Sequence, residues 1–213
     1  MRSLRITEIF HSLQGESTTV GLPTVFVRLT GCPLRCQYCD TAYAFSGGQM
    51  LAIDAILAQV AAFGCQHVCV TGGEPLAQPG CIDLLKSLCD AGHTVSIETS
   101  GARDISAVDE RVMVVMDLKT PDSAECDKNK WSNLSYLKAG DQIKFVLCSR
   151  KDYEWACAMM TEHQLTARAH ILFSPSWGQL NPTTLADWII QDRLPVRFQL
   201  QLHKILWHDA PGH

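Results

Sequence analysis

The sequence from residue 31 to residue 41 reads Gly31-Cys32-Pro33-Leu34-Arg35-Cys36-Gln37-Tyr38-Cys39-Asp40-Thr41. Its three cysteines lie within eight positions and follow the spacing Cys-x3-Cys-x2-Cys. Short cysteine spacings of this kind are typical of metal sites. The glycine, proline and polar residues between them indicate a loop, and a loop has no core for the thiols to fill. We therefore interpret residues 31–41 as a loop that holds an inorganic centre.

Two kinds of centre suit three thiolates. A structural zinc ion takes four ligands, so zinc would need a further one, for which His11 and Cys65 are candidates. An iron–sulfur cluster can be held by cysteine thiolates. Three thiolates on a four-iron cluster leave one iron open to a substrate or a cofactor. The spacing alone leaves both centres possible.

The composition is that of an ordinary globular protein. Of its 213 residues 46% are hydrophobic and 19% charged, so we expect a single domain over residues 1–213. The net charge of -4 and the lack of a basic tract argue against a nucleic-acid partner. The N-terminus lacks the apolar region of a signal peptide, and the longest apolar stretch, residues 50–64, is too short and polar to cross a bilayer. We expect a cytoplasmic protein without membrane contact, and we interpret the cysteines outside the loop as buried, small apolar residues rather than disulfides.

Hydrophobic patterning indicates strands that alternate with helices. We expect strands at residues 6–11, 24–30, 67–71, 94–98, 112–118, 142–147, 169–173 and 196–202, and helices at residues 53–63, 81–91, 152–163 and 182–190. Such alternation predicts an α/β fold with a parallel sheet. The carboxyl ends of its strands share one edge, where ligands bind, and most of the polar motifs follow directly after strands. Because the elements are too few for an eightfold barrel, we expect an incomplete, TIM-like β/α barrel.

Two motifs, in this order, resemble those of the radical S-adenosylmethionine enzymes. The cysteine spacing with Tyr38 directly before Cys39 resembles their cluster loop. The run Gly72-Gly73-Glu74-Pro75 resembles the motif that binds the amino group of S-adenosylmethionine. The resemblance implies a radical SAM core, a 4Fe-4S cluster on Cys32, Cys36 and Cys39, and S-adenosylmethionine as cofactor. It also implies an external electron donor, flavodoxin-like or ferredoxin-like.

Within that superfamily the chain resembles the 7-carboxy-7-deazaguanine synthases. The resemblance is carried by Arg28 and by the runs at residues 13–16, 39–41, 71–75, 98–101 and 199–204. It implies a carbon–nitrogen lyase that contracts the ring of 6-carboxy-5,6,7,8-tetrahydropterin to 7-carboxy-7-deazaguanine with loss of ammonia. This reaction belongs to 7-deazapurine (queuosine precursor) biosynthesis. The resemblance also implies that Mg²⁺ assists and that the enzyme is a homodimer.

The same resemblance assigns roles to individual residues. It implies that S-adenosylmethionine contacts Tyr38, Gly72, Gly73, Glu74, Ser100, Asp117, Lys119 and Ser174. It implies that the pterin contacts Leu13, Gln14, Gly15, Glu16, Arg28, Thr71, Glu98 and His203, and that Thr41 binds Mg²⁺. Several of these residues have a purely structural alternative. Gln14, Gly15 and Glu16 could form an exposed polar turn, and the run that begins at Ser174 could be a solvent loop. Thr41 could bond to nearby backbone, Arg28 could form an ion pair with Glu8 or another acid, and His203, at the end of the last expected strand, could be a structural hydrogen-bond partner.

The sequence departs from the family pattern at two places. Ser17 follows Glu16 where the family has glycine, and Asp117-Leu118-Lys119 stands where many relatives have Ser-Pro-Lys. Glycine alone adopts a positive φ without strain, so Ser17 bears directly on the conformation of the turn after Glu16. Two other functions remain as alternatives: a different radical S-adenosylmethionine enzyme, such as a glycyl-radical activase, and a zinc-binding structural module.

Overall fold

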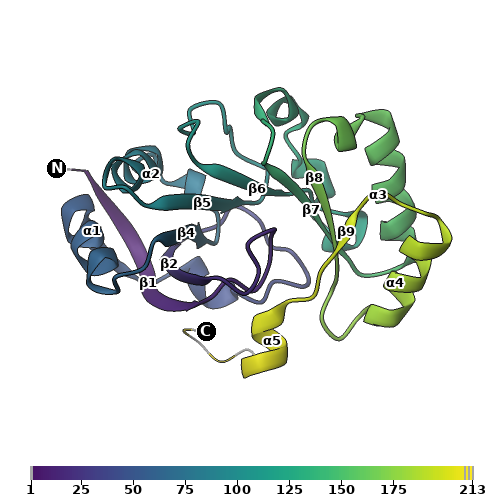
Figure 1. The fold of residues 1–213 in the computed structure, drawn as a ribbon, viewed down its shortest axis with the longest axis horizontal. Coiled ribbons are helices and arrows are strands. Elements are labelled where there is room, and N and C mark those ends of the chain that lie inside the picture. Colours follow the sequence, from purple (N-terminus) through teal and green to yellow (C-terminus); the bar gives the residue numbers. More distant parts are fainter. Residues whose placement is uncertain (1, 209, 211, 213) are drawn as a thin grey trace.

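The computed structural model describes residues 2–208, 210 and 212. Its strands are β1 (Ser3–Leu13), β2 (Pro23–Leu29), β3 (Gln49–Ala52), β4 (His67–Gly72), β5 (Thr94–Thr99), β6 (Met113–Asp117), β7 (Gln142–Leu147), β8 (His170–Pro175) and β9 (Arg197–Phe198). In this part of the chain they form a nine-stranded sheet of order β3-β1-β2-β4-β5-β6-β7-β8-β9 (Figure 1). β1 is antiparallel to β2 and β3, whereas every pair from β2 to β9 is parallel.

The α-helices are α1 (Ile53–Ala62), α2 (Cys81–Asp90), α3 (Arg150–Glu162), α4 (Pro182–Gln191) and α5 (Leu202–Trp207). α3 begins at Ser149, whose side chain accepts a hydrogen bond from the Asp152 amide. α4 begins at Asn181, which accepts from two amides of its first turn, with Pro182 at the first helical position. Short 3-10 turns at Pro121–Ser123, Cys126–Lys128 and Trp131–Tyr136 fill the connection from β6 to β7.

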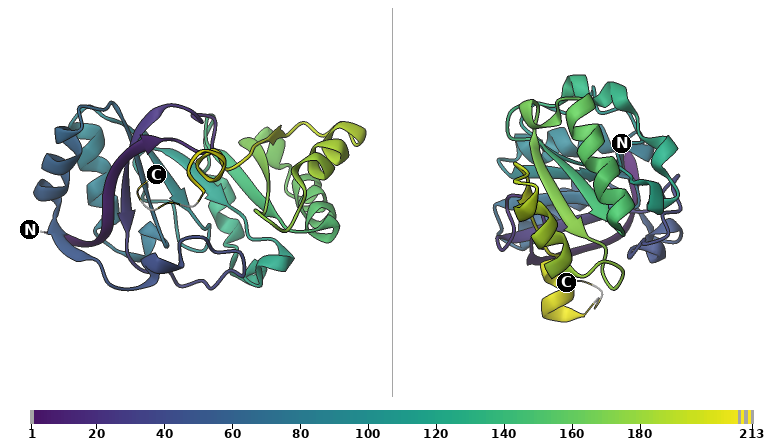
Figure 2. Two further views of the ribbon diagram at one scale, coloured as in Figure 1. Left: turned by 90° about the horizontal axis from the view of Figure 1, so that it is seen from below. Right: turned by 90° about the vertical axis from the view of Figure 1, so that its right-hand side faces the viewer.

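The core lies between the sheet and the first four helices. Fully buried strand residues such as Val27, Ile97 and Phe145 belong to one apolar cluster with Ile56 of α1 and Leu185 of α4. In Figure 1, α1 and α2 lie at one end of the sheet, α3 and α4 lie at the other, and α5 lies apart from both pairs. The left view of Figure 2 shows α5, in yellow, between the two pairs of helices. Residues of α5 and of the strand ends line one cavity on this side of the sheet.

The open, mostly parallel sheet confirms the expected incomplete barrel. The helices at residues 53–63, 81–91, 152–163 and 182–190 are confirmed to within two residues at each end. β3 was not expected, because its residues were read as part of a single apolar stretch with α1. Among the described residues, every helix is too short or too polar to span a bilayer.

The expected strand at residues 196–202 is wrong beyond its first half. β9 ends at Phe198, and α5 begins at Leu202. The alternation of Gln199-Leu200-Gln201-Leu202 looks like a strand in sequence. However, the Leu202 amide donates to the Gly15 carbonyl at 3.0 Å, so contact with a distant loop turns the chain away from the sheet.

Candidate functional site

A cavity of about 290 Å³ opens at the carboxyl ends of the parallel strands, and residues of α5 also line it. Its walls contain most of the residues expected from the sequence to form the site: Leu13, Gln14, Gly15, Glu16, Arg28, Cys32, Cys36, Tyr38, Cys39, Thr41, Thr71, Gly72, Gly73, Glu98, Ser100, Asp117, Lys119 and His203. Glu74 and Ser174 are fully buried and lie behind the described lining. Segments far apart in sequence thus meet in one place.

The cysteine loop leaves β2 and packs directly against the glycine motif after β4. The Glu74 amide donates to the Gly31 carbonyl at 2.8 Å. A Cβ at Gly73 would lie 2.4 Å from that carbonyl oxygen and 2.7 Å from the Cβ of Cys32. Gly72 has a φ of 151°, and a Cβ there would lie 2.2 Å from the Leu29 carbonyl oxygen. The two glycines therefore allow the loops to touch, which any side chain would prevent.

The three thiols of the loop line the cavity and are half-buried. Burial raises the pKa of Cys36 to about 11, while nearby Lys119 opposes that shift. In the described part of the chain, no group of three or more His, Cys, Asp or Glu residues is arranged around one metal ion. Three half-buried thiols from one loop, all lining the cavity, fit an iron–sulfur cluster, which cysteine thiolates hold.

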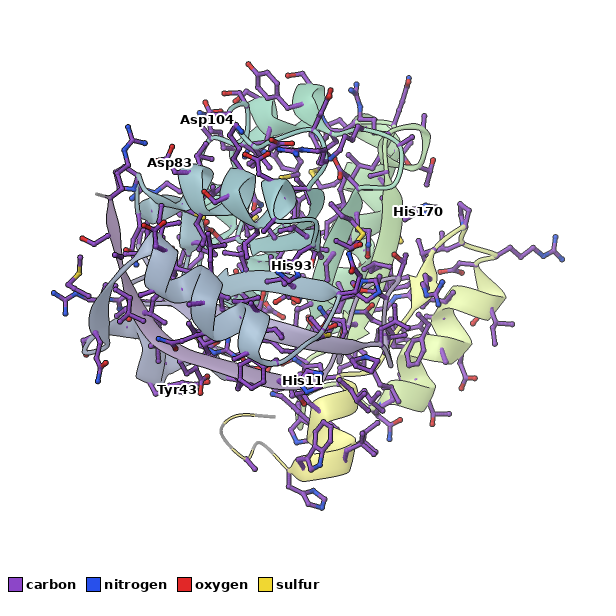
Figure 3. All side chains as sticks on the ribbon, turned by 60° about the vertical axis from the view of Figure 1, so that its left-hand side comes forward. His11, Tyr43, Asp83, His93, Asp104 and His170 are labelled. Atoms are coloured by element: carbon purple, nitrogen blue, oxygen red, sulfur yellow. The ribbon has the colours of Figure 1, made fainter. Side chains whose placement is uncertain are left out.

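The two candidates for a fourth zinc ligand lie elsewhere. The Cys65 thiol contacts the Pro23 carbonyl at 3.2 Å, at the start of β2, whereas the cysteine loop follows the end of that strand. A seven-residue strand separates these points by about 20 Å. His11, labelled in Figure 3, pairs with Val25, also near the start of β2. Neither side chain can join the three thiols on one ion.

Glu74 connects the glycine motif to the end of β5. Its carboxylate accepts hydrogen bonds from the Leu76 amide at 3.0 Å, the Thr99 hydroxyl at 2.9 Å and the Ser100 amide at 2.7 Å, and it also contacts the Ser100 hydroxyl. The carboxylate is therefore satisfied by the protein itself and shapes the cavity wall from behind.

Arg28 is held by the acid that the sequence offered as its structural partner. Its Nε donates to Glu8 Oε1 at 2.7 Å, and the Tyr43 hydroxyl, labelled in Figure 3, donates to the same oxygen at 2.7 Å. The guanidinium carbon lies 5.7 Å from the centre of the Phe10 ring. Within the described residues, neither Nη atom forms a hydrogen bond. The ion pair thus fixes the side chain and leaves the two terminal nitrogens for a ligand.

A row of alternating charges forms the floor of the cavity. Glu16 Oε2 lies 2.6 Å from Lys144 Nζ, and Asp117 Oδ2 lies 3.7 Å from that nitrogen and 3.0 Å from Lys119 Nζ. Lys119 Nζ is also 5.7 Å from the centre of the Tyr38 ring, on the side of the cysteine loop. Lys144 was missed by the sequence analysis, although a lysine in an apolar strand is the same kind of signal as Arg28.

The polar loop after β1 contacts the neighbouring strand ends. Gln14 Nε2 donates to Glu98 Oε1 at 3.4 Å, and the Thr71 hydroxyl donates to Glu98 Oε2 at 2.9 Å. Ser17 has a φ of 69°, so the turn has the conformation in which glycine is favoured. Its amide donates to Gln199 Oε1 at 3.0 Å, and its hydroxyl lies 2.7 Å from the Thr19 hydroxyl.

α5 closes one side of the cavity. His203 belongs to this helix, not to a strand, and a Cβ on Gly15 would lie 2.4 Å from its Nδ1, so the imidazole packs on that glycine. Asp40 Oδ2 accepts from Lys204 Nζ at 3.0 Å and from Gln201 Nε2 at 3.3 Å. Burial raises the pKa of Asp40, but Lys204 outweighs it and the pKa falls to about 2. These contacts join the cysteine loop to α5, and no sequence signal distinguished them.

Comparisons with known proteins agree with this site. The model of the radical SAM superfamily matches residues 26–139. A 7-carboxy-7-deazaguanine synthase of Chlorobaculum tepidum is 45% identical to this chain over 98% of the chain and 97% of the relative. One of Koribacter versatilis is 39% identical over 96% and 97%. The crystal structure of QueE from Escherichia coli superimposes with a TM-score of 0.73 and 22% identity, covering 94% of this chain and 95% of that one, which supports the fold.

The superfamily match accounts for the three cavity-lining thiols, because radical SAM enzymes use a 4Fe-4S cluster together with S-adenosylmethionine. The relatives at 39% and 45% identity extend the likeness over nearly the whole chain, including the loop after β1 and α5. The chain is therefore an enzyme of the radical SAM superfamily and belongs to the 7-carboxy-7-deazaguanine synthase family.

Proposed function

We propose that this enzyme contracts the ring of 6-carboxy-5,6,7,8-tetrahydropterin to 7-carboxy-7-deazaguanine with loss of ammonia, as a carbon–nitrogen lyase of 7-deazapurine (queuosine precursor) biosynthesis. One observation carries this proposal. The cavity combines a three-thiol loop with an arginine whose terminal nitrogens are open and with carboxylates at its floor. A substrate that has a carboxylate at one end and N–H donors at the other matches this distribution of charge.

Cys32, Cys36 and Cys39 would hold the 4Fe-4S cluster. When bound, this cluster and S-adenosylmethionine supply a carbon-centred radical that side chains cannot generate. The chain's own contribution is to orient the two ligands and to exclude water. Apolar side chains of Phe10, Phe26 and Leu34 in the lining serve that exclusion.

S-adenosylmethionine would bind along the wall formed by Tyr38, Gly72, Gly73, Ser100, Asp117 and Lys119. Backbone groups of the two glycines can approach a ligand closely because no side chain intervenes. We propose that Glu74 and Ser174, which lie behind this wall, act by shaping it. The contact that holds Ser100 to Glu74 is one such support.

The pterin would bind between Arg28 and the floor of the cavity. A guanidinium with two open nitrogens suits a carboxylate, which it can bind through parallel hydrogen bonds. Gln14, Glu98 and Thr71 form a hydrogen-bonded group at the strand ends, and Leu13, Gly15, Glu16 and His203 complete the pocket. Carboxylates there would accept from the N–H groups of the pyrimidine ring.

We propose Thr41 as a ligand of Mg²⁺, because its hydroxyl is at the cavity wall and a hard cation takes oxygen ligands. The hydroxyl donates to Asp40 Oδ1 at 3.2 Å in this structure, so a second oxygen is close. We further propose a cytoplasmic homodimer that takes its electron from a flavodoxin-like or ferredoxin-like protein.

Anaerobic reconstitution followed by turnover tests the function. The reconstituted chain should bind four irons and convert the carboxylated tetrahydropterin to 7-carboxy-7-deazaguanine in the presence of S-adenosylmethionine and a reductant. An intact cluster without this product would favour another radical S-adenosylmethionine reaction. One bound zinc and no iron would remove the radical mechanism. Removal of Mg²⁺ should slow turnover in the unaltered enzyme and have less effect in Thr41→Ala.

A further inference from the structure

Lys144 lies between two carboxylates at the floor of the cavity. It is the third residue of β7, and its side chain is 11% exposed. Its Nζ lies 2.6 Å from Glu16 Oε2 and 3.7 Å from Asp117 Oδ2. Burial by itself lowers the pKa of Lys144, but Glu16 and Asp117 outweigh burial and raise it. The side chain is therefore a cation that binds Glu16 directly and lies within ion-pair distance of Asp117, whose Oδ2 is held more closely by Lys119 at 3.0 Å.

Each of these carboxylates has one oxygen left over. Glu16 Oε1 and Asp117 Oδ1 are buried and have no hydrogen-bond partner among the described residues. A buried acceptor without a partner costs about 1–3 kcal/mol, and more when it is charged. Both residues line the cavity, so a ligand with N–H groups can supply the missing donors. The floor is thus built to accept hydrogen bonds on both sides of Lys144.

We propose that Lys144 is a positioning residue for substrate recognition: by binding one oxygen of Glu16 at 2.6 Å, it directs the other oxygen of Glu16 at the N–H donors of an aminopyrimidinone ring. The inference rests on the proposed function, which supplies a pterin as the ligand. It also explains how the enzyme can distinguish a 2-amino ring from a 2-oxo ring. Replacing the 2-amino group by a carbonyl puts a hydrogen-bond acceptor where the pterin has a donor. A carboxylate oxygen repels such an acceptor.

Binding of two stable analogues tests this role. 6-Carboxypterin has the 2-amino group, whereas 6-carboxylumazine has a carbonyl in its place. Equilibrium dialysis against the reconstituted enzyme with S-adenosylmethionine measures both dissociation constants on one preparation. Their ratio does not depend on the fraction of folded protein. We expect the unaltered enzyme to bind 6-carboxypterin at least about tenfold more tightly than 6-carboxylumazine. The carbonyl of the lumazine cannot donate a hydrogen bond, so a carboxylate oxygen at the cavity floor would stay unpaired.

The variant Lys144→Met removes the cation and keeps a side chain of similar length. Binding of 6-carboxypterin should weaken by about tenfold or more, and the preference over the lumazine should shrink towards one. If Lys144 acts through Glu16, adding Lys144→Met to Glu16→Gln should weaken binding by less than it does alone. The matched control is Lys128→Met, which removes an exposed ion pair with Asp127 and should leave both constants unchanged.

The outcomes separate the inference from the function beneath it. An unaltered enzyme that binds neither analogue would contradict the proposed pterin substrate. An enzyme that prefers the pterin, together with a Lys144→Met variant of the same affinity and preference, would overturn the role of Lys144 alone. Full additivity of the Lys144 and Glu16 changes would also overturn it. If Lys144→Met does not fold, the ratio of the two dissociation constants is measured on Lys144→Gln instead.

Discussion

Arg28 shows how a single side chain can serve both the fold and a ligand. It pairs with Glu8 in register across β1 and β2, and the contact uses only its Nε. A structural ion pair and a binding role, which the sequence presented as alternatives, are compatible because a guanidinium has donors on more than one edge. The neighbouring rings of Phe10 and Tyr43, with centres 5.7 and 5.8 Å from the guanidinium carbon, restrict its orientation further.

Replacing Arg28 by lysine should therefore be far from conservative. An ammonium that binds Glu8 has no second nitrogen for the substrate carboxylate. We expect Arg28→Lys to raise KM for the pterin by about tenfold or more, with a smaller change in kcat, as lost charged hydrogen bonds predict. Steady-state kinetics of the reconstituted enzyme measures both. Arg150→Lys, at an exposed ion pair with Glu154, is the matched control, and equal KM values in the two variants would contradict the role.

Ser17 has a positive φ, which is costly for a residue with a side chain. The left-handed region costs about 1–2 kcal/mol for most residues, and glycine avoids that cost. The Ser17 hydroxyl contacts Thr19 Oγ1 and also accepts from the Thr19 amide at 3.1 Å, which offsets part of it. We expect Ser17→Ala to lower the free energy of unfolding by about 1–2 kcal/mol. Ser17→Gly should be more stable than Ser17→Ala by about 1 kcal/mol. Urea denaturation of the unaltered protein and both variants measures these differences. Equal stability of Ser17→Ala and Ser17→Gly would contradict the argument.

At the scale of elements, the site depends on loops that touch across strand ends. Gly73 has an ordinary backbone conformation, so its role is one of space alone. Gly73→Ala would place a Cβ against the Gly31 carbonyl and Cys32, and the cysteine loop would have to move. We expect the variant to incorporate less than half of the iron of the unaltered chain, measured after anaerobic reconstitution. A Cβ at Gly80 would meet the Leu4 side chain at 3.2 Å and backbone only at 3.7 Å, so Gly80→Ala should incorporate iron normally. Full iron content in Gly73→Ala would contradict this steric argument.

The second element contact joins the cysteine loop to α5. Asp40 binds Lys204 and Gln201, and α5 carries His203 onto Gly15. Removing the carboxylate in Asp40→Ala should loosen the helix, because Lys204 is buried and loses a charged partner. We expect amide hydrogens of residues 202–207 to exchange at least about fivefold faster, while those of β4 and β5 are unchanged.

Asp127→Ala provides the matched control for this contact. It removes an exposed carboxylate that is paired with Lys128 in the connection from β6 to β7. Hydrogen exchange followed by mass spectrometry compares the two variants with the unaltered protein. If α5 exchanges at the same rate in all three, Asp40 does not hold the helix.

For the molecule as a whole, the sequence predicted the architecture well because strands and helices alternate with clear hydrophobic periods. Residues 196–202 show the limit of that method. Their alternation is that of a strand, but the hydrogen bond from Leu202 to Gly15 is a contact over a long stretch of chain, and no local pattern encodes it. β3 was missed for a related reason, because a short edge strand and a helix that follow each other read as one apolar run.

The parts of the site that lie in contiguous sequence motifs were predicted, and the parts that only folding brings together were not. The cysteine loop and residues 72–75 are local in sequence, and both form the cavity wall or support it. Lys144 and Lys204 belong to the same site only because folding brings them to Glu16 and Asp40. A lysine in a short helix such as α5 is usually a solvated residue, so the burial of Lys204 against Asp40 has no sequence signal. For Lys144, the apolar strand around it indicates a buried cation, but only the fold shows that its partner is Glu16.

The arrangement of the whole molecule makes a final prediction about its cysteines. Cys36 lies at the carboxyl ends of the parallel strands, and Cys65 lies at their amino ends, about 20 Å away along β2. Cys36→Ala should lose the cluster, and with it the iron content and the visible absorption of the reconstituted chain, because two thiolates do not replace three. Cys65→Ala should keep four irons and full turnover. Loss of the cluster in both variants would mean that Cys65 supports the site through the fold or ligates metal, and retention in both would move the metal centre away from the loop at residues 31–41.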